Sequence, residues 1–256
     1  MEKGIIVVSF GTSYKETREK CIESIENQIR DTFKDHKVVR AFTSNFIIKK
    51  LKERDGIHVD TIHEAIEALK VDGIKEIYVQ PLHVIPGFEY EKVQMAVKMA
   101  NHDKETTVKL GMPLFNEEHD YDEVISAINE SLPKTGDGEG VVLMGHGTEH
   151  FANACYSMLQ AKYRDVRQNV HIANVEGYPE LDHILDSLKQ YKKITLMPLM
   201  IVAGDHAQND MAGDEEDSFK SILEDEGIEV ECILEGLGEN KGIQKIFAGR
   251  VEALLK

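Results

Sequence analysis

Cysteine is scarce in this sequence of 256 residues. Cys21, Cys155 and Cys232 lie far apart, are odd in number and lack C-x-x-C spacing. They therefore predict neither a disulfide framework nor a thiolate zinc site. We interpret them as buried or unreactive thiols.

Basic residues are also few, because 30 Lys and Arg stand against 46 Asp and Glu and give a formal net charge of −16. Such a charge repels nucleic acid and anionic membrane surfaces and attracts cations, so we expect neither of the first two as a partner. A polycarboxylate ligand would also be repelled at long range. Its pocket would need local N–H donors or basic groups to offset that field.

Other features are missing altogether. No apolar run reaches transmembrane length, and the N-terminus lacks the pattern of a signal peptide, so we expect a cytoplasmic protein. Neither a Walker loop nor G-x-G-x-x-G occurs, so no nucleotide or organic cofactor is expected. A homo-oligomer is left open.

Short β-branched runs alternate with longer amphipathic segments along the chain. The pattern predicts helices that include residues 17–33, 60–69, 89–100, 181–188 and 217–226. It predicts buried strands at residues 4–10, 37–43, 74–82, 107–112, 140–144, 170–175, 194–201 and 228–233. Such alternation favours an α/β fold with largely parallel, covered sheets.

Two pairs of segments indicate that the halves of the chain repeat each other. GIIVVSFGT at 4–12 matches GVVLMGHGT at 140–148, and PLHVIPGFE at 81–89 matches PLMIVAGDH at 198–206. Pro and Gly accumulate at 133–140, where we place a boundary between domains 1–133 and 134–256. The sequence therefore predicts two similar lobes, each with a mostly parallel sheet flanked by helices, related by a pseudo-twofold axis.

Three polar side chains of the second half follow predicted strands. His146, Glu176 and His206 come after the strands that end near residues 145, 175 and 201. Because ligands bind beyond the carboxyl ends of parallel strands, we expect these side chains on one rim. Two imidazoles and a carboxylate are typical ligands of a divalent first-row metal.

The remaining candidates surround that rim. Glu89 is the repeat mate of His206 and should face the same cleft, although a helix-start Glu explains it equally well. His83 is interpreted as a core histidine with satisfied hydrogen bonds, and the other histidines as background. We expect substrate contacts from the turn at 10–13, the glycine before His146 and the loop before His206, namely Phe10, Gly11, Thr12, Ser13, Gly145, Val202, Ala203, Gly204 and Asp205.

Together these segments resemble one known family. VSFGTS at 8–13, AFTS at 41–44, QPLH at 80–83, EYEK at 89–92, MGHG at 144–147, Val175-Glu176, YPE at 178–180 and MPLMIVAGDH at 197–206 are similar to the anaerobic-type sirohydrochlorin cobaltochelatases. The likeness extends to GLGEN at 236–240 and so covers almost the whole chain.

The resemblance implies a class II, ATP-independent chelatase with two α/β lobes around a cleft. Its members insert Co(II) into the tetrapyrrole sirohydrochlorin during anaerobic cobalamin synthesis. It further implies that His146, Glu176 and His206 contact the metal, that His146 also accepts a proton, and that Glu89 is an acid-base or substrate-facing group.

Two alternatives stay open at this point. The same cleft would suit a metal or tetrapyrrole carrier that does not catalyse metallation. The enzyme could also use iron or nickel, since the affinity order of divalent metals does not by itself select cobalt.

Overall fold

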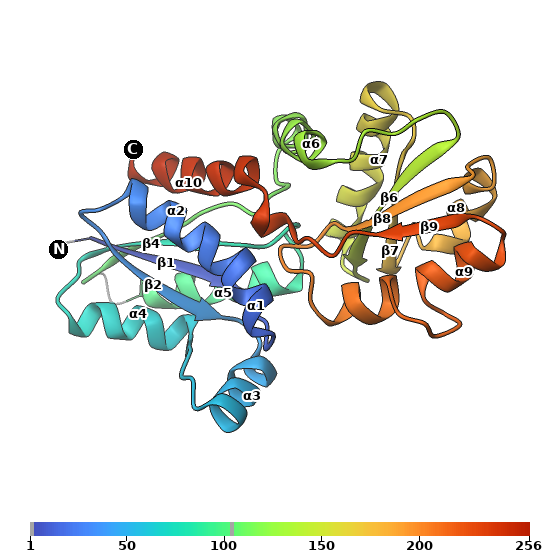
Figure 1. The fold of residues 1–256 in the computed structure, drawn as a ribbon. Coiled ribbons are helices and arrows are strands. Elements are labelled where there is room, and N and C mark those ends of the chain that lie inside the picture. Colours follow the sequence, from blue (N-terminus) through green and yellow to red (C-terminus); the bar gives the residue numbers. More distant parts are fainter. Residues whose placement is uncertain (1–2, 103–104) are drawn as a thin grey trace.

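Two parallel β-sheets frame the protein in the computed structural model, which describes residues 3–102 and 105–256 (Figure 1). The first sheet has the order β3-β2-β1-β4-β5 and the second β7-β6-β8-β9. The first contains β1 (Lys3–Ser9), β2 (Lys37–Phe42), β3 (Asp60–Thr61), β4 (Glu76–Pro81) and β5 (Thr107–Leu110). The second contains β6 (Glu139–Gly147), β7 (Val170–Glu176), β8 (Lys193–Pro198) and β9 (Glu229–Cys232). The predicted α/β class with two parallel sheets is confirmed.

The two sheets share topology and register. In the first, β1 lies between β2 and β4, and Val8 pairs with Pro81; in the second, β6 lies between β7 and β8, and Met144 pairs with Pro198. These are the positions that the sequence repeat equates. The repeat is therefore real at the level of strand pairing.

Helices cover both faces of each sheet, as parallel strands require. Beside the first sheet are α1 (Lys15–Thr17), a π-helical segment η1 (Arg18–Glu23), α2 (Ser24–Thr32), α3 (Asn45–Asp55), α4 (Ile62–Val71) and α5 (Phe88–Ala100). Beside the second are η2 (Phe151–Asn153), α7 (Ala154–Val166), α8 (Leu181–Leu188), the π-helical η3 (Ala207–Met211) and α9 (Phe219–Asp225). The chain between the lobes adds α6 (Glu118–Ser131), η4 (Leu237–Glu239) and α10 (Lys241–Leu255).

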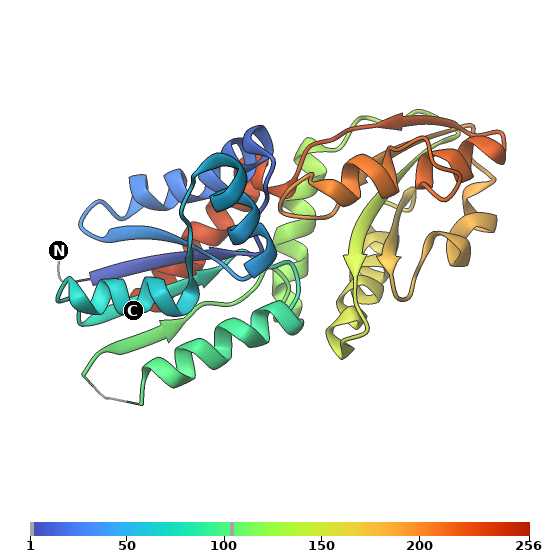
Figure 2. The same ribbon diagram turned by 90° about the horizontal axis from the view of Figure 1, so that it is seen from below.

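The helices that follow the last strand of each sheet cross between the lobes. After β9 the chain returns, and α10 lies beside α2 and also packs against α6 (Figures 1 and 2). Asn240 Nδ2 donates to the Ala127 carbonyl at 2.7 Å, and Arg250 donates to the Leu114 carbonyl at 2.8 Å. In return, Lys162 of α7 pairs with Asp122 of α6 at 2.7 Å. The first sheet ends at Leu110 and the second begins at Glu139, so the division at 133/134 stays a prediction. Helix α10 comes from the second half of the chain but packs on α2 of the first lobe, where its apolar face is buried.

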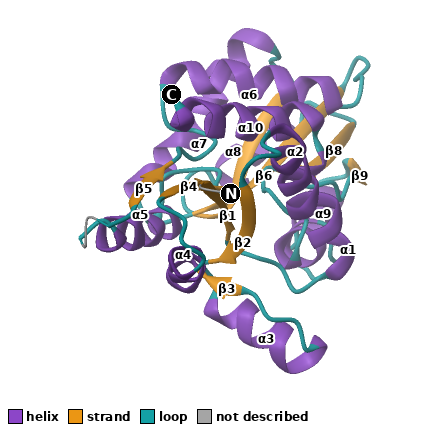
Figure 3. Ribbon diagram, turned by 90° about the vertical axis from the view of Figure 1, so that its left-hand side faces the viewer, coloured by secondary structure: helices purple, strands orange, loops and turns teal. Residues whose placement is uncertain are grey.

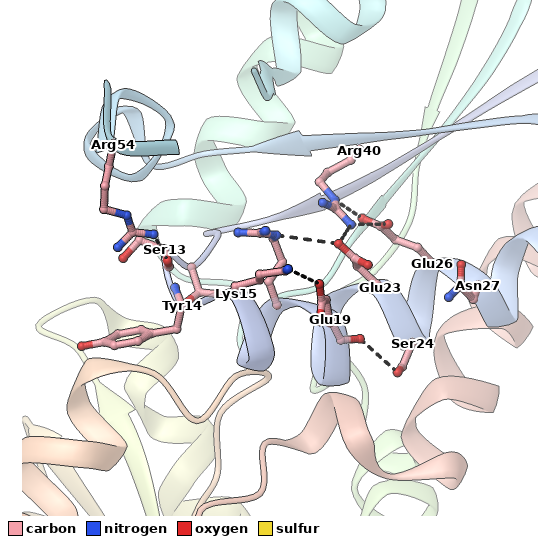
Figure 4. A network of polar contacts seen from close by, with 12 residues as sticks. Ser13, Tyr14, Lys15, Glu19, Glu23, Ser24, Glu26, Asn27, Arg40 and Arg54 are labelled. Atoms are coloured by element: carbon pink, nitrogen blue, oxygen red, sulfur yellow. Dashed lines mark hydrogen bonds and ion pairs between the residues drawn. The ribbon is translucent and has the colours of Figure 1, made fainter. Parts of the chain in front are cut away.

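A buried carboxylate fixes α2 over β2. Glu26 is fully buried, and its two oxygens accept from Arg40 Nε at 2.6 Å and Nη2 at 2.8 Å (Figure 4). Charge-assisted, bidentate pairs of this kind have a narrow geometry. The pair thus holds the helix that follows the Phe10–Ser13 turn. Predicted helix 17–33 is accordingly found as the continuous run α1, η1 and α2.

Two further expectations concern the whole chain. All three cysteines are free, and burial raises the pKa of each thiol, that of Cys21 to about 12. A raised thiol pKa reduces the fraction of reactive thiolate, in agreement with the interpretation of unreactive thiols. Among the described residues, no helix combines the length and apolar character needed to cross a bilayer.

Candidate active site

A cleft of about 1160 Å³ opens between the lobes, at the carboxyl ends of the central strands. The first lobe contributes the turn after β1 and the segment between β4 and α5, and the second contributes the ends of β6 and β7 and the loop after β8. This is where parallel sheets place ligands. The volume exceeds that of ordinary small-molecule pockets, so the cleft suits a large ligand.

His146 is the penultimate residue of β6, and its side chain is exposed to the cleft. Gly147 after it has φ +75°, and a Cβ at this residue would lie 1.5 Å from the carbonyl oxygen of Glu176. Only glycine permits this approach of β6 to β7. In the first lobe, Gly11 takes the same place with φ +96° and packs against the ring of Phe42.

The imidazoles of His146 and His206 face each other across the rim. Their ring centroids are 4.6 Å apart at an interplanar angle of 84°. Nδ1 of His146 lies 2.9 Å from the Gly147 carbonyl oxygen, and Nδ1 of His206 lies 2.8 Å from Asp210 Oδ2. Because both partners only accept, each Nδ1 carries the proton and each Nε2 keeps its lone pair. The two rings are therefore in the tautomer that binds a metal through Nε2.

Glu176 ends the neighbouring strand β7 and lines the same cleft. The three predicted metal ligands thus share one cleft and come from adjacent strands, as the sequence suggested. Within residues 3–102 and 105–256, however, no group of three His, Cys, Asp or Glu is close enough to hold one ion together. The two imidazoles form the assembled part of the site, and the third ligand stays a prediction.

The predicted substrate contacts divide into two groups. Two of them, Gly145 and Ala203, do not line the cleft. Ala203 belongs to the core, and a Cβ on Gly145 would lie 2.4 Å from Asn174 Oδ1 and 2.6 Å from the Tyr156 ring. Gly145 is therefore required by packing behind the rim. The residues that do line the cleft are Phe10, Gly11, Thr12, Ser13, Val202, Gly204 and Asp205.

The first lobe places His83 and Glu89 in the wall of the cleft. His83 is only 8% exposed, and neither ring nitrogen has a hydrogen-bond partner in the described part of the chain. Burial lowers the pKa of His83 to about 4, while Glu89 opposes and Lys92 adds to this shift. The interpretation of His83 as a core histidine with satisfied hydrogen bonds is wrong, because within residues 3–102 and 105–256 neither ring nitrogen is hydrogen-bonded.

Glu89 is held by one oxygen only. Lys92 forms an ion pair with its Oε1, whereas Oε2 is buried and has no hydrogen-bond partner among the described residues. The expectation that Glu89 faces the cleft of its repeat mate His206 agrees with this placement.

Two polar contacts join the lobes beside the cleft. The Tyr14 hydroxyl donates to Asp205 Oδ1 at 2.9 Å, and this bond raises the pKa of Tyr14. His150 Nε2 lies 3.2 Å from Glu91 Oε1, and the His150 ring packs edge-on against Phe88. From the sequence, His150 belongs to the background histidines, because nothing local shows that α5 of the other lobe approaches it.

Helix α3 supplies a basic group to an otherwise acidic cleft. Lys50 is the only Lys or Arg among the described residues that line it, and its ammonium lies 5.9 Å from the centroid of the exposed Phe46 ring. The acidic side chains on the walls are Glu89, Glu149, Glu176, Glu180 and Asp205. The sequence pattern predicts no helix at 45–55. The net charge of the chain does predict local N–H donors or basic groups near a polycarboxylate ligand, but it does not identify Lys50 as one of them.

Comparison with known proteins identifies the family. The model of the cobalt chelatase family (CbiK) matches residues 3–256. The chain belongs to the CbiK family of cobalt chelatases. A CbiK relative named sirohydrochlorin cobaltochelatase, from Salmonella typhimurium, is 41% identical over 257 residues, which cover 100% of this chain and 97% of the relative. Sirohydrochlorin cobaltochelatase CbiKC of Nitratidesulfovibrio vulgaris is 34% identical over 98% of this chain and 90% of its own.

Solved structures agree on the fold. SirB from Bacillus subtilis with Fe³⁺ superposes with a TM-score of 0.67 at 14% identity, covering 99% of this chain and 96% of that one. A sirohydrochlorin chelatase SirB from Bacillus subtilis subspecies spizizenii, in complex with cobalt, gives 0.63 at 14% identity over 99% and 95%. At this identity the likeness shows that the CbiK chain has the chelatase fold.

Proposed function

We propose that this chain inserts Co(II) into sirohydrochlorin without ATP, as a step of anaerobic cobalamin synthesis. Both relatives described above carry the name of this activity. The observation that carries the proposal is the facing pair of imidazoles, His146 and His206, with free Nε2 atoms in a cleft large enough for a tetrapyrrole.

Capture of the metal begins with the charge of the cleft. Its acidic walls raise the local concentration of cations. His146 and His206 then bind the ion through Nε2, and Glu176 supplies a carboxylate oxygen. Nitrogen and oxygen ligands hold a first-row divalent ion while allowing its transfer, whereas thiolates would hold soft metals more firmly.

The ring enters between the lobes. Its apolar faces meet Phe10, Phe46 and Val202, and its carboxylates meet Lys50 and the hydroxyl and N–H groups of Thr12 and Ser13. These groups meet the requirement for local donors that the net charge of −16 imposes on a polycarboxylate ligand.

Metallation also needs an acceptor for the two pyrrole protons. The family resemblance assigns this role to His146, with Glu89 as an acid-base group. Since Nδ1 of His146 donates to Gly147, its one lone pair on Nε2 serves either the metal or a proton at a given moment. His146 therefore takes a proton only when it is not holding the metal.

The test is a timed absorbance assay with sirohydrochlorin and Co(II), without ATP. We expect the free-base spectrum to disappear catalytically and faster with Co(II) than with Fe(II) or Ni(II). A faster reaction with Fe(II) or Ni(II) would change the metal assigned to the reaction, but the protein would still be a chelatase. Stoichiometric binding without acceleration over the uncatalysed reaction would leave a carrier in place of a chelatase.

A further inference from the structure

The first-lobe wall of the cleft contains three buried polar atoms, on two residues, without a partner in the described part of the chain. Both ring nitrogens of His83 and Oε2 of Glu89 are buried and lack a hydrogen-bond partner in residues 3–102 and 105–256. Leaving such buried groups unpaired is unfavourable, because they lose their hydrogen bonds to water and gain none in return. Since both residues line the cleft, a ligand that occupies it is the natural partner.

Metallation requires proton acceptors that the opposite wall of the cleft does not supply. Metallation breaks two pyrrole N–H bonds, and the second-lobe imidazoles have one free lone pair each, on Nε2. When both lone pairs hold the ion, neither can accept a proton. The protons must then leave toward groups that are not bound to the metal.

We propose that His83 and Glu89 accept the two pyrrole protons, on the wall opposite the metal-binding imidazoles. This inference rests on the proposed function and assigns His83, which the family motifs left without a role. In each transfer the N–H electron pair stays on the ring nitrogen and binds the metal. One proton goes to an imidazole nitrogen of His83 and one to a carboxylate oxygen of Glu89, so nothing is oxidised or reduced.

The surroundings of the pair suit this role. Burial keeps the His83 ring neutral, with a pKa of about 4, so its lone pair is available near neutral pH. Glu89 acts on His83 in the opposite sense and favours the imidazolium that forms when the first proton arrives. Glu89 is 29% exposed and is paired with the exposed Lys92, so a proton on the carboxylate can pass to solvent.

The experiment compares His83→Gln with His36→Gln under steady-state and binding conditions. His36 is a matched control, because its ring nitrogens are also buried without a partner among the described residues and it does not line the cleft. We expect His83→Gln to lower kcat about a hundredfold, as loss of a general base does. Spectral titrations should give unchanged dissociation constants for sirohydrochlorin and Co(II), and His36→Gln should keep full turnover.

Three results would overturn the proposal. If the folded His83→Gln protein has the kcat of wild type, His83 is not a proton acceptor. The same conclusion follows if its activity is lost only because sirohydrochlorin binds more weakly. If His83→Gln does not fold, Glu89→Gln decides, since this side chain is partly exposed at the start of α5. An unchanged kcat in Glu89→Gln would contradict the proposal that Glu89 and His83 accept the two pyrrole protons. Wild-type protein that fails to metallate the ring would instead refute the proposed function.

Discussion

At the scale of single residues, Asp210 determines what His206 offers to the cleft. Its carboxylate accepts the Nδ1–H of His206 at 2.8 Å, which fixes the orientation of the ring and leaves Nε2 as the metal-binding nitrogen. The sequence shows this pair only as a His and an Asp four residues apart in an acidic stretch. The π-helical segment η3, which follows His206, brings the two side chains together.

We therefore expect Asp210→Asn to weaken Co(II) capture. Loss of a carboxylate behind a metal-binding histidine typically costs 10–100-fold in metal affinity, so the Co(II) concentration for half-maximal rate should rise about tenfold or more. The kcat at saturating Co(II) should change little. Metallation rates measured at a series of Co(II) concentrations give both the kcat and the Co(II) concentration for half-maximal rate. Asp217→Asn, in the same acidic stretch but exposed, is the control. Equal effects from the two variants would indicate a general loss of negative charge.

At the scale of elements, α3 stands apart from the rest of the first lobe. It projects beyond β3 in Figures 1 and 3, and Leu51 is its one fully buried residue. Arg54 ties it to the turn after β1 by donating to the Ser13 carbonyl at 2.5 Å (Figure 4). Ile47 and Ile48 of the same helix are partly buried against the core around Leu51, while Phe46 and Lys50 line the cleft.

For this helix, Lys50→Glu should raise the KM for sirohydrochlorin about tenfold and leave the Co(II) requirement unchanged. An exposed ion pair contributes up to about 1 kcal/mol, and charge reversal replaces attraction with repulsion. The effect should shrink at high salt because exposed charges are screened. Lys52→Glu, exposed on the same helix but outside the cleft, is the matched control. A rise in KM that is equal in both variants, or independent of salt, would contradict a direct contact with ring carboxylates.

At the scale of the whole molecule, the two lobes are joined by crossing helices and by contacts at the cleft. The helices α6 and α10 pack together at the boundary, whereas Tyr14 and Asp205 meet beside the cleft. The packing of α6 against α10 involves many side chains. The contact between Tyr14 and Asp205 is a single hydrogen bond between exposed side chains and is therefore easily opened.

We expect Tyr14→Phe to weaken the binding of the metallated ring about fivefold, because one hydrogen bond contributes about 1 kcal/mol to the closed lobes. Its thermal unfolding temperature should match wild type, since the bond lies outside both cores. Fluorescence or absorbance titration with cobalt-sirohydrochlorin gives the affinity. Tyr178→Phe, exposed and not lining the cleft, controls for loss of a tyrosine hydroxyl. An unchanged affinity would show that this contact does not hold the lobes closed.

Much of the fold was predictable from local pattern. Buried runs such as residues 4–10 and 140–144 identified the strands, because a central parallel strand needs apolar side chains on both faces. The repeated GT and PL segments predicted the shared topology. The sequence could also place His146, Glu176 and His206 in one cleft, because strand ends converge on one rim whatever lies between them in the sequence. Their role as metal ligands stays a prediction.

Only the tertiary structure decided the rest. The exchange of α10 between lobes, the contact of His150 with Glu91 and the approach of Lys50 to the cleft all join residues far apart in sequence. Periodicity reports which face of an element is buried, but not which distant element covers it. For the same reason, the sequence determined that His83 lies at the end of a buried strand. The structure decided that this residue lines the cleft and that its ring nitrogens have no hydrogen-bond partner among the described residues.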